Sequence, residues 1–195
     1  MIGLIQKLLL DMVREEAGAD AASEVKRRTG LAPDFEFRLD TDYDDEQARQ
    51  LLGHACAVLD ASENDVLERF ARTFLRSALS HFPTFFALAA DSRAFLARQP
   101  AIHNMLGSGL RNPQRLKAIN DKFSITPHDD GCLEVRYRSP NRWCVLYRAL
   151  AREVADHYGE RLDIATLDCA KRGTQVCVFR LSWPEAGGHE ASPAA

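Results

Sequence analysis

Apolar residues in the first two-thirds of the chain recur at the spacing of amphipathic helices. The pattern predicts a helix over 5–13, a short one over 20–30 that ends at a glycine, and longer ones over 48–59 and 62–78. Pro83 marks a break, after which the apolar positions of A-I-H-N-M-L predict a further helix. The first part of the protein is therefore expected to be a layer of helices.

The last third of the chain shows instead the alternation typical of half-buried strands. The segments 122–128 and 132–139 flank D-D-G, and 162–169 and 175–183 flank K-R-G-T, so each pair predicts a β-hairpin. A helical stretch beginning at Trp143 joins the two hairpins. We expect an α+β fold in which the helical layer packs on a four-stranded, mostly antiparallel sheet with helices, with a crevice between the layers.

Composition and charge limit the classes of protein. A formal net charge of −3 argues against a nucleic-acid-binding surface, and no apolar run reaches the roughly 18 residues that a membrane span needs. The N-terminal segment lacks the basic lead and cleavage site of a secretory signal, so a cytoplasmic protein is expected. We expect one domain over 1–184 and a disordered tail over 185–195, because the tail has no core-forming pattern.

His103 is the first candidate for ligand chemistry. It lies in an apolar helical segment with few polar neighbours, where an imidazole is able to ligate a metal or a heme iron. The alternative is a partly buried histidine that hydrogen-bonds to the backbone, which is the commoner role of a lone histidine. The pattern alone leaves both roles open.

Tyr137, Ser139 and Arg142 form a second candidate site, at the end of a predicted strand in Y-R-S-P-N-R-W-C. Two hydroxyls and a guanidinium are together suited to bind a carboxylate or a phosphate, because arginine supplies two parallel donors. A strand end whose polar groups are simply solvated is the alternative. These residues therefore predict an anion site only if other features of the chain require one.

The cysteines are the third candidate. Five cysteines without a secretory signal favour reduced thiols or a metal over disulfides. Cys169 and Cys177 flank the second hairpin turn and Cys144 lies in the preceding helical stretch, so three thiolates are able to meet as in a zinc site, with His157 or Asp168 as a fourth ligand. The spacing is not C-x-x-C, and buried cysteines acting as small apolar residues are the alternative. No catalytic motif is present, so an enzyme is not expected.

Taken together, these features resemble the heme-nitric oxide/oxygen binding (H-NOX) family, which is related to the heme domain of soluble guanylate cyclase. The opening M-I-G-L-I-Q-K-L-L-L-D-M-V resembles the family's N-terminal helix, and F-P-T-F-F resembles its aromatic stretch before the heme-bearing helix. A-I-H-N-M resembles the segment that carries the iron ligand, and Y-R-S resembles the start of the family's Tyr-x-Ser-x-Arg motif. The resemblance runs from Met1 to about Trp183.

The resemblance implies a heme b held between the two layers, with His103 ligating the iron and Tyr137 and Ser139 binding the propionates. It implies a gas sensor in which NO weakens the bond between iron and histidine, so that the freed helix shifts and biases a partner protein between two states. The stand-alone bacterial members resemble regulators of histidine kinases or cyclic-di-GMP enzymes, so a signalling protein of either kind is the expected partner.

Two positions depart from the family pattern. Position 141 is Asn141 where the motif has arginine, and Arg142 lies one residue later, so either Arg142 reaches a propionate or that propionate lacks a charged partner. Loss of the arginine contact is expected to loosen heme without abolishing its binding. The family's proline beside the porphyrin is replaced by Leu116, which implies a flatter porphyrin or a looser pocket.

The gas-binding side of the pocket is expected to be apolar. Oxygen-binding members place a tyrosine nine residues after the motif tyrosine, and that position is Leu146. The expected apolar neighbours are Ile5, Leu9, Phe74 and Ala78. Because this side offers no hydrogen-bond donor to bound oxygen, the resemblance implies NO as the ligand. A register shifted by one residue would place Tyr147 there instead.

Some bacterial members also carry a zinc site built from three cysteines and a histidine. Cys144, Cys169 and Cys177 match the cysteine positions, whereas Thr166 stands at the histidine position. The resemblance thus leaves two alternatives open for these thiols. They hold zinc beside a heme sensor, or they serve a heme-poor relative that senses oxidation through zinc and cysteine.

Overall fold

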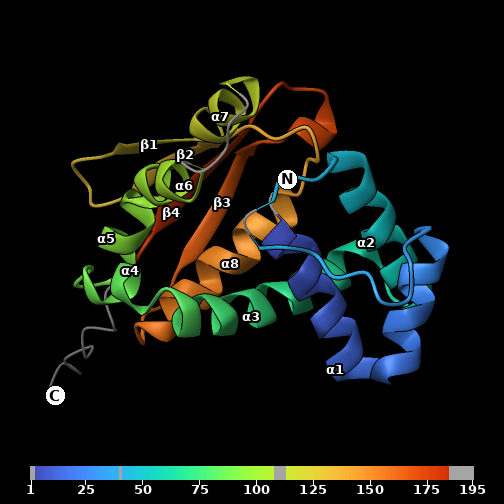
Figure 1. Ribbon diagram of the computed structural model, residues 1–195. Helices are drawn as coiled ribbons and strands as arrows, with labels where there is room; N and C mark the ends of the chain where they lie inside the picture. Colours follow the sequence, from blue (N-terminus) through green and yellow to red (C-terminus); the bar gives the residue numbers. More distant parts are fainter. Residues whose placement is uncertain (1–2, 40, 108–112, 185–195) are drawn as a thin grey trace, which may run out of the picture.

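The computed structural model describes residues 3–39, 41–107 and 113–184, which form two layers (Figure 1). The helical layer and the short helices after it are α1 (Gly3–Arg28), α2 (Asp45–Leu59), α3 (Glu63–His81), α4 (Pro83–Ala87), α5 (Ser92–Ala97), α6 (Gln99–Gly107) and α7 (Pro113–Asn120). The second layer contains β1 (Phe123–Pro127), β2 (Leu133–Tyr137), α8 (Cys144–His157), β3 (Asp163–Asp168), η1 (Ala170–Arg172) and β4 (Cys177–Ser182). The predicted α+β fold is confirmed.

Local sequence signals set the ends of the first helices. The side chain of Asp44 accepts a hydrogen bond at the start of α2, and that of Ser62 accepts one from the Asp65 backbone at the start of α3. Pro83 occupies the first turn of α4, where its missing N–H costs nothing. The two helices predicted near the N-terminus are both present within α1, with a break between them at Gly18, whose φ of 90° is non-helical and is rarely adopted by other residues.

The four strands form one antiparallel sheet in the order β1-β2-β4-β3. Both predicted hairpins are present, since β1 pairs with β2 and β3 pairs with β4. Gly131 closes the first turn with a φ of 81°, and Gly173 ends η1 in the second connection with a φ of 103°. The central register places Val135 opposite both Ile125 and Phe179, which fixes the inward face of the sheet.

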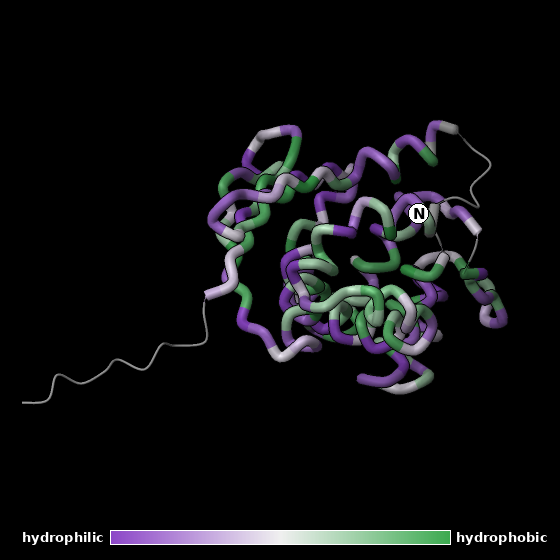
Figure 2. The backbone as a smooth tube through the Cα atoms, turned by 90° about the vertical axis from the view of Figure 1, so that its left-hand side faces the viewer, coloured by the Kyte–Doolittle hydropathy of each residue, from purple (hydrophilic) through white to green (hydrophobic). Residues whose placement is uncertain are grey.

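Helix α8 lies between the sheet and α3 (Figure 1). Its side chains are shared between two hydrophobic cores: Leu146 packs with the helical layer, whereas Tyr147 and Val154 pack with the sheet. Figure 2 shows hydrophobic and hydrophilic residues alternating along the helices, as amphipathic helices require. Because successive helical residues point about 100° apart, α8 presents a different face to each layer.

The predicted disordered tail, 185–195, lies outside the described residues. Across the ranges given above, no helix combines the length and the apolar character that crossing a membrane would take.

Candidate ligand-binding cavity

A cavity of about 230 Å³ lies between the helical layer and the sheet layer. Its walls come from the start of α1, the second half of α3, the short helices α4 to α6, the first two strands and α8. Most of the lining side chains are aromatic or aliphatic. The polar or ionisable members among the described residues are Gln99, His103, Lys122, Tyr137, Ser139 and Tyr147. An apolar cavity with a few polar groups is the usual form of a site for a small molecule or a cofactor.

The structure brings most of the predicted site residues to this cavity. Those that line it are Ile5, Phe74, Ala78, His103, Tyr137, Ser139 and Leu146. Three others do not line it. Leu9 is 2% exposed within the core of the helical layer, Leu116 lies on α7, and Arg142 is exposed in the loop before α8 with a φ of 52°.

The chemical state of His103 suits it to ligate a metal. Its ring lies on α6 against the ring of Phe123, with 4.7 Å between the two centroids. Burial, followed by the positive charge of Lys122, lowers the pKa of His103 from 6.5 to about 3. The imidazole is therefore neutral at pH 7, and a neutral imidazole is the form that binds iron.

Gln99 stands one turn before His103 on α6 and also lines the cavity. Residues four apart on a helix lie on the same side, so the two side chains face the same space. The buried Oε1 of Gln99 has no hydrogen-bond partner among the described residues. No sequence pattern singles out this residue, because a glutamine in a helix is ordinary.

Leu146 and Tyr147 both line the cavity, but from different faces of α8. Leu146 belongs to the core of the helical layer. Tyr147 stacks between Tyr137 and Phe179, with centroid distances of 5.9 and 5.0 Å, and lies 5.5 Å from Phe123, the ring that contacts His103. Tyr147 is therefore on the sheet side with His103, and Leu146 is on the side of the N-terminal helices.

The end of β2 brings two hydroxyls to the cavity. Tyr137 is buried, and its ring stacks on Phe123 at 5.2 Å. Burial raises the pKa of Tyr137, so its hydroxyl keeps its proton and remains a donor. Ser139 follows two residues later and accepts a hydrogen bond from the backbone N–H of Asn141 at 3.3 Å.

Asn141, at the position of the motif arginine, is buried and turned away from this role. Its Oδ1 accepts a hydrogen bond of 2.6 Å from Nη1 of Arg49 on α2. Arg49 is also held by Glu46, with 2.5 Å between Nη2 and the carboxylate oxygen. This contact ties the helical layer to the loop before α8 across 92 residues of sequence.

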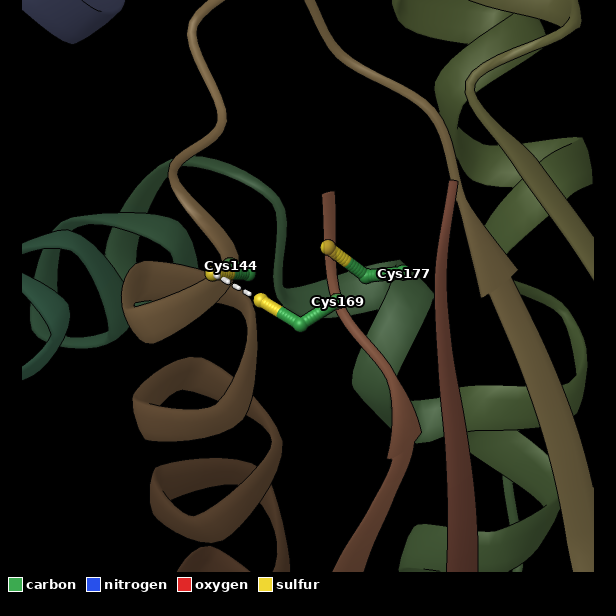
Figure 3. Close-up of side chains that lie close together, drawn as sticks. All are labelled: Cys144, Cys169 and Cys177. Atoms are coloured by element: carbon green, nitrogen blue, oxygen red, sulfur yellow. Dashed lines mark hydrogen bonds between the residues drawn. The ribbon is translucent and has the colours of Figure 1, made fainter. Parts of the chain in front are cut away.

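The three predicted cysteines gather at the start of α8, as Figure 3 shows. The sulfur atoms of Cys144, Cys169 and Cys177 lie within 4.8 Å of one another, with 3.9 Å between the first two. Burial raises the pKa of Cys177 to about 11. Burial also acts to raise the pKa of Cys169, but hydrogen bonds, the first from the Lys171 backbone, outweigh it and leave that pKa lowered.

A fourth ligand does not accompany these thiols in the described part of the chain. The group within ligand distance contains the three cysteines and no histidine or carboxylate. Thr166 lies on β3, and its Oγ1 is 3.4 Å from Nη1 of Arg148. A three-thiol group fits a zinc site whose fourth ligand is water or comes from elsewhere.

The fold and the cavity define a class of protein, a domain in which a helical layer covers an α+β layer and an apolar cavity suited to a small molecule lies between them. The sequence matches the family model described as Haem-NO-binding over residues 2–166. The protein therefore belongs to this family, which consists of heme-based gas-sensor domains.

Solved structures of H-NOX domains share the fold. An H-NOX protein from S. oneidensis in the Fe(II)NO ligation state has a TM-score of 0.81 at 18% identity, over 94% of this chain and 99% of that chain. An oxygen-binding H-NOX domain related to soluble guanylate cyclases, in its oxygen complex, has a TM-score of 0.77 at 18% identity, over 94% and 95%. The I5F mutant of T. Tengcongensis H-NOX has a TM-score of 0.79 at 17% identity, over 94% and 97%. No curated protein matches the sequence.

The residues of the cavity fit the cofactor of the family. Aromatic and aliphatic walls suit a porphyrin ring, the neutral imidazole of His103 suits its iron, and the hydroxyls of Tyr137 and Ser139 suit its carboxylates. When bound, heme supplies the iron centre that takes up a diatomic gas. The structural neighbours include both an NO complex and an oxygen complex, so likeness of fold does not choose the gas.

Proposed function

We propose that this protein binds heme b in the cavity through His103, senses NO, and regulates a separate signalling enzyme. The observation that carries the proposal is the neutral imidazole of His103 on the wall of an otherwise largely apolar cavity. Ferrous iron needs a neutral nitrogen ligand, and the porphyrin needs apolar contact. Tyr137 and Ser139 are proposed to bind the propionates.

The choice of NO rests on the opposite side of the cavity. Leu146, Ile5 and Phe74 belong to or pack against the core of the helical layer and offer no hydrogen-bond donor from their side chains. Bound oxygen carries partial negative charge and is held by a donor, whereas NO needs none. Tyr147 has a hydroxyl, but its ring lies among the aromatic residues on the side of His103. The register that makes Leu146 the gas-facing residue is therefore the one we favour.

Heme loading tests the role of His103. The protein is expressed with heme supply, and bound heme per chain is measured by absorbance. Wild type is expected to carry one heme per chain, and His103→Ala to lose most of it, because the iron loses its protein ligand. His54→Ala is the matched control, since His54 is partly buried on α2 and does not line the cavity. Undiminished heme in His103→Ala would show that another residue holds the iron.

The output is proposed to be a change in a partner enzyme, either a histidine kinase or a cyclic-di-GMP enzyme. The sequence has no catalytic motif of its own, and sensor domains of this family regulate partner proteins. His103 lies on α6, which contacts both α7 and β1, so a shift of α6 would be passed on to the neighbouring helix and to the first strand of the sheet. The direct test is the partner's activity with the heme-loaded protein before and after NO.

The thiol cluster supports a second candidate function, in which zinc and cysteines sense oxidation. The supporting observation is that three sulfur atoms lie within 4.8 Å. Metal analysis of the purified protein is expected to give one zinc per chain, lost in Cys177→Ser and kept in Cys56→Ser, because Cys56 lies outside the cluster. Wild-type protein without zinc would rule out the metal and leave only free thiols.

A further inference from the structure

Lys122 is a charged side chain on the wall of an otherwise largely apolar cavity. It lies in the turn between α7 and β1. Among the described residues that line the cavity, it is the only lysine or arginine. No sequence pattern singles it out, because a lysine before a strand is ordinarily solvated.

The ammonium group of Lys122 makes no close ion pair with the carboxylates that the structure describes. Among the described residues, no carboxylate oxygen lies within 4.0 Å of its Nζ, which is the limit for an ion pair. Burial lowers the pKa of Lys122, and the charge of Asp45 acts in the opposite direction through space. A charge that is partly removed from water and has no ion-pair partner within reach destabilises the folded chain. Packing alone gives no reason for lysine at this position.

The backbone places Lys122 beside the two hydroxyls at the end of β2. Its carbonyl oxygen accepts a hydrogen bond of 2.9 Å from the backbone N–H of Arg138. The next residue, Phe123, is paired with Tyr137 across the sheet. Lys122, Tyr137 and Ser139 all line the cavity, so one edge of it holds a cation and two hydroxyls. That combination suits a carboxylate.

Three other described cations near the end of β2 do not line the cavity. Arg49 donates to Asn141 and pairs with Glu46, and it does not line the cavity. Arg138 and Arg142 are exposed and do not line it either. Arg142 therefore does not replace the arginine that the family motif has at position 141.

We infer that Lys122 supplies the positive charge that binds a heme propionate, together with Tyr137 and Ser139, in place of the motif arginine. This inference rests on the proposed heme site. A cation from the start of β1 thus takes over the role of one from the loop after β2. Asn141, freed from that role, ties the loop to α2 through Arg49.

The experiment compares two forms of the ligand in several variants of the full chain. Heme-free protein is titrated with hemin and with hemin dimethyl ester, in which both propionates are neutral. Wild type is expected to bind hemin more tightly than the ester by about ten-fold or more, as for contacts to a charged group. In Lys122→Met this preference is expected to fall by about ten-fold, and Lys122→Arg is expected to restore most of it.

Controls separate the charge from the fold. Lys117→Met removes a lysine from the exposed face of α7, where it pairs with Asp121, and is expected to behave as wild type. Arg49→Met is expected to keep the preference for hemin as well. Heme-free Lys122→Met is expected to melt at the same or a higher temperature than wild type, because no close ion pair is lost and a partly buried charge is removed.

Three outcomes would refute the assignment, and they are distinguishable. If wild type takes up neither form of heme, the heme site fails and this assignment fails with it. If wild type binds hemin but Lys122→Met keeps the full preference over the ester, only the role of Lys122 is overturned. Loss of the preference in Arg49→Met instead would assign the propionate to Arg49.

Discussion

The hydroxyl of Tyr147 offers a sharp test of the cavity's geometry. The Tyr147 ring is stacked among Tyr137, Phe123 and Phe179, yet its oxygen is buried without a hydrogen-bond partner among the described residues. Burial also raises the pKa of this hydroxyl, so it stays protonated. Tyr147→Phe removes the oxygen and keeps the ring, so the stacking contacts survive.

The expected effect is a gain in stability. A buried hydroxyl without a partner costs roughly 1–3 kcal/mol in desolvation, so removing it is expected to raise the free energy of unfolding by about 1 kcal/mol. For a chain of this size that corresponds to an increase in Tm of about 2–4 °C. The gain applies to the heme-free protein, whose cavity the structure describes.

Tyr158→Phe is the matched control for this measurement. The Tyr158 hydroxyl donates a 2.8 Å hydrogen bond to the backbone oxygen of Phe86, so its removal is expected to cost about 1 kcal/mol. Thermal or urea unfolding of both variants is expected to show changes in stability of opposite sign, an increase for Tyr147→Phe and a decrease for Tyr158→Phe. A loss of stability in Tyr147→Phe equal to that in Tyr158→Phe would refute the reasoning, because it would mean that the Tyr147 hydroxyl has a partner.

Three further predictions follow from other parts of the structure. Leu146→Tyr places a hydrogen-bond donor in the gas-facing wall, so the ferrous protein is expected to form an oxygen complex in air-saturated buffer, whereas wild type and Leu146→Phe are not, as measured by absorption spectroscopy. Gly3→Ala is expected to destabilise the fold by roughly 1–3 kcal/mol, because a Cβ there would lie 2.2 Å from the Arg38 carbonyl oxygen. Gly53→Ala is its control in urea unfolding: a Cβ there meets open space, so alanine is expected to stabilise α2 by about 0.5–1 kcal/mol. Folding lowers the pKa of His103 from 6.5 to about 3, so the unfolded chain binds more protons than the folded one between these pH values. The contribution of the neutral His103 to the free energy of unfolding is therefore fully present above pH 6.5 and is lost as the pH falls toward 3. This pH dependence of stability is expected to flatten in heme-free His103→Leu.

The fold was largely predictable because its signals are local. Apolar spacing gave the long helices, and turn sequences around Gly131 and Gly173 gave both hairpins. The three cysteines were predicted to meet because two of them flank one hairpin turn, and their sulfur atoms do lie together. Gly18 separates the two predicted N-terminal helices, in the stretch that apolar spacing leaves out of both, but its φ of 90° is a backbone angle that periodicity does not report.

The site was less predictable because its contacts join distant segments. The bond between Arg49 and Asn141 spans 92 residues, so no motif around either residue announces it. Lys122 becomes a cavity residue only when the turn before β1 packs beside the end of β2. Arg142 was a reasonable candidate by its position in sequence, but a φ of 52° in an exposed loop keeps it out of the lining. Resemblance supplied the ligand chemistry that spacing alone left open.

The central claim is that a heme held by His103 in this cavity takes up NO and not oxygen. The most direct measurement is the absorption spectrum of the ferrous, heme-loaded protein, first in air-saturated buffer and then with NO. We predict a spectrum that does not change to that of an oxygen complex in air and a clear shift of the main heme band with NO. A stable oxygen complex in air, or a ferrous heme whose band does not move with NO, would contradict the account.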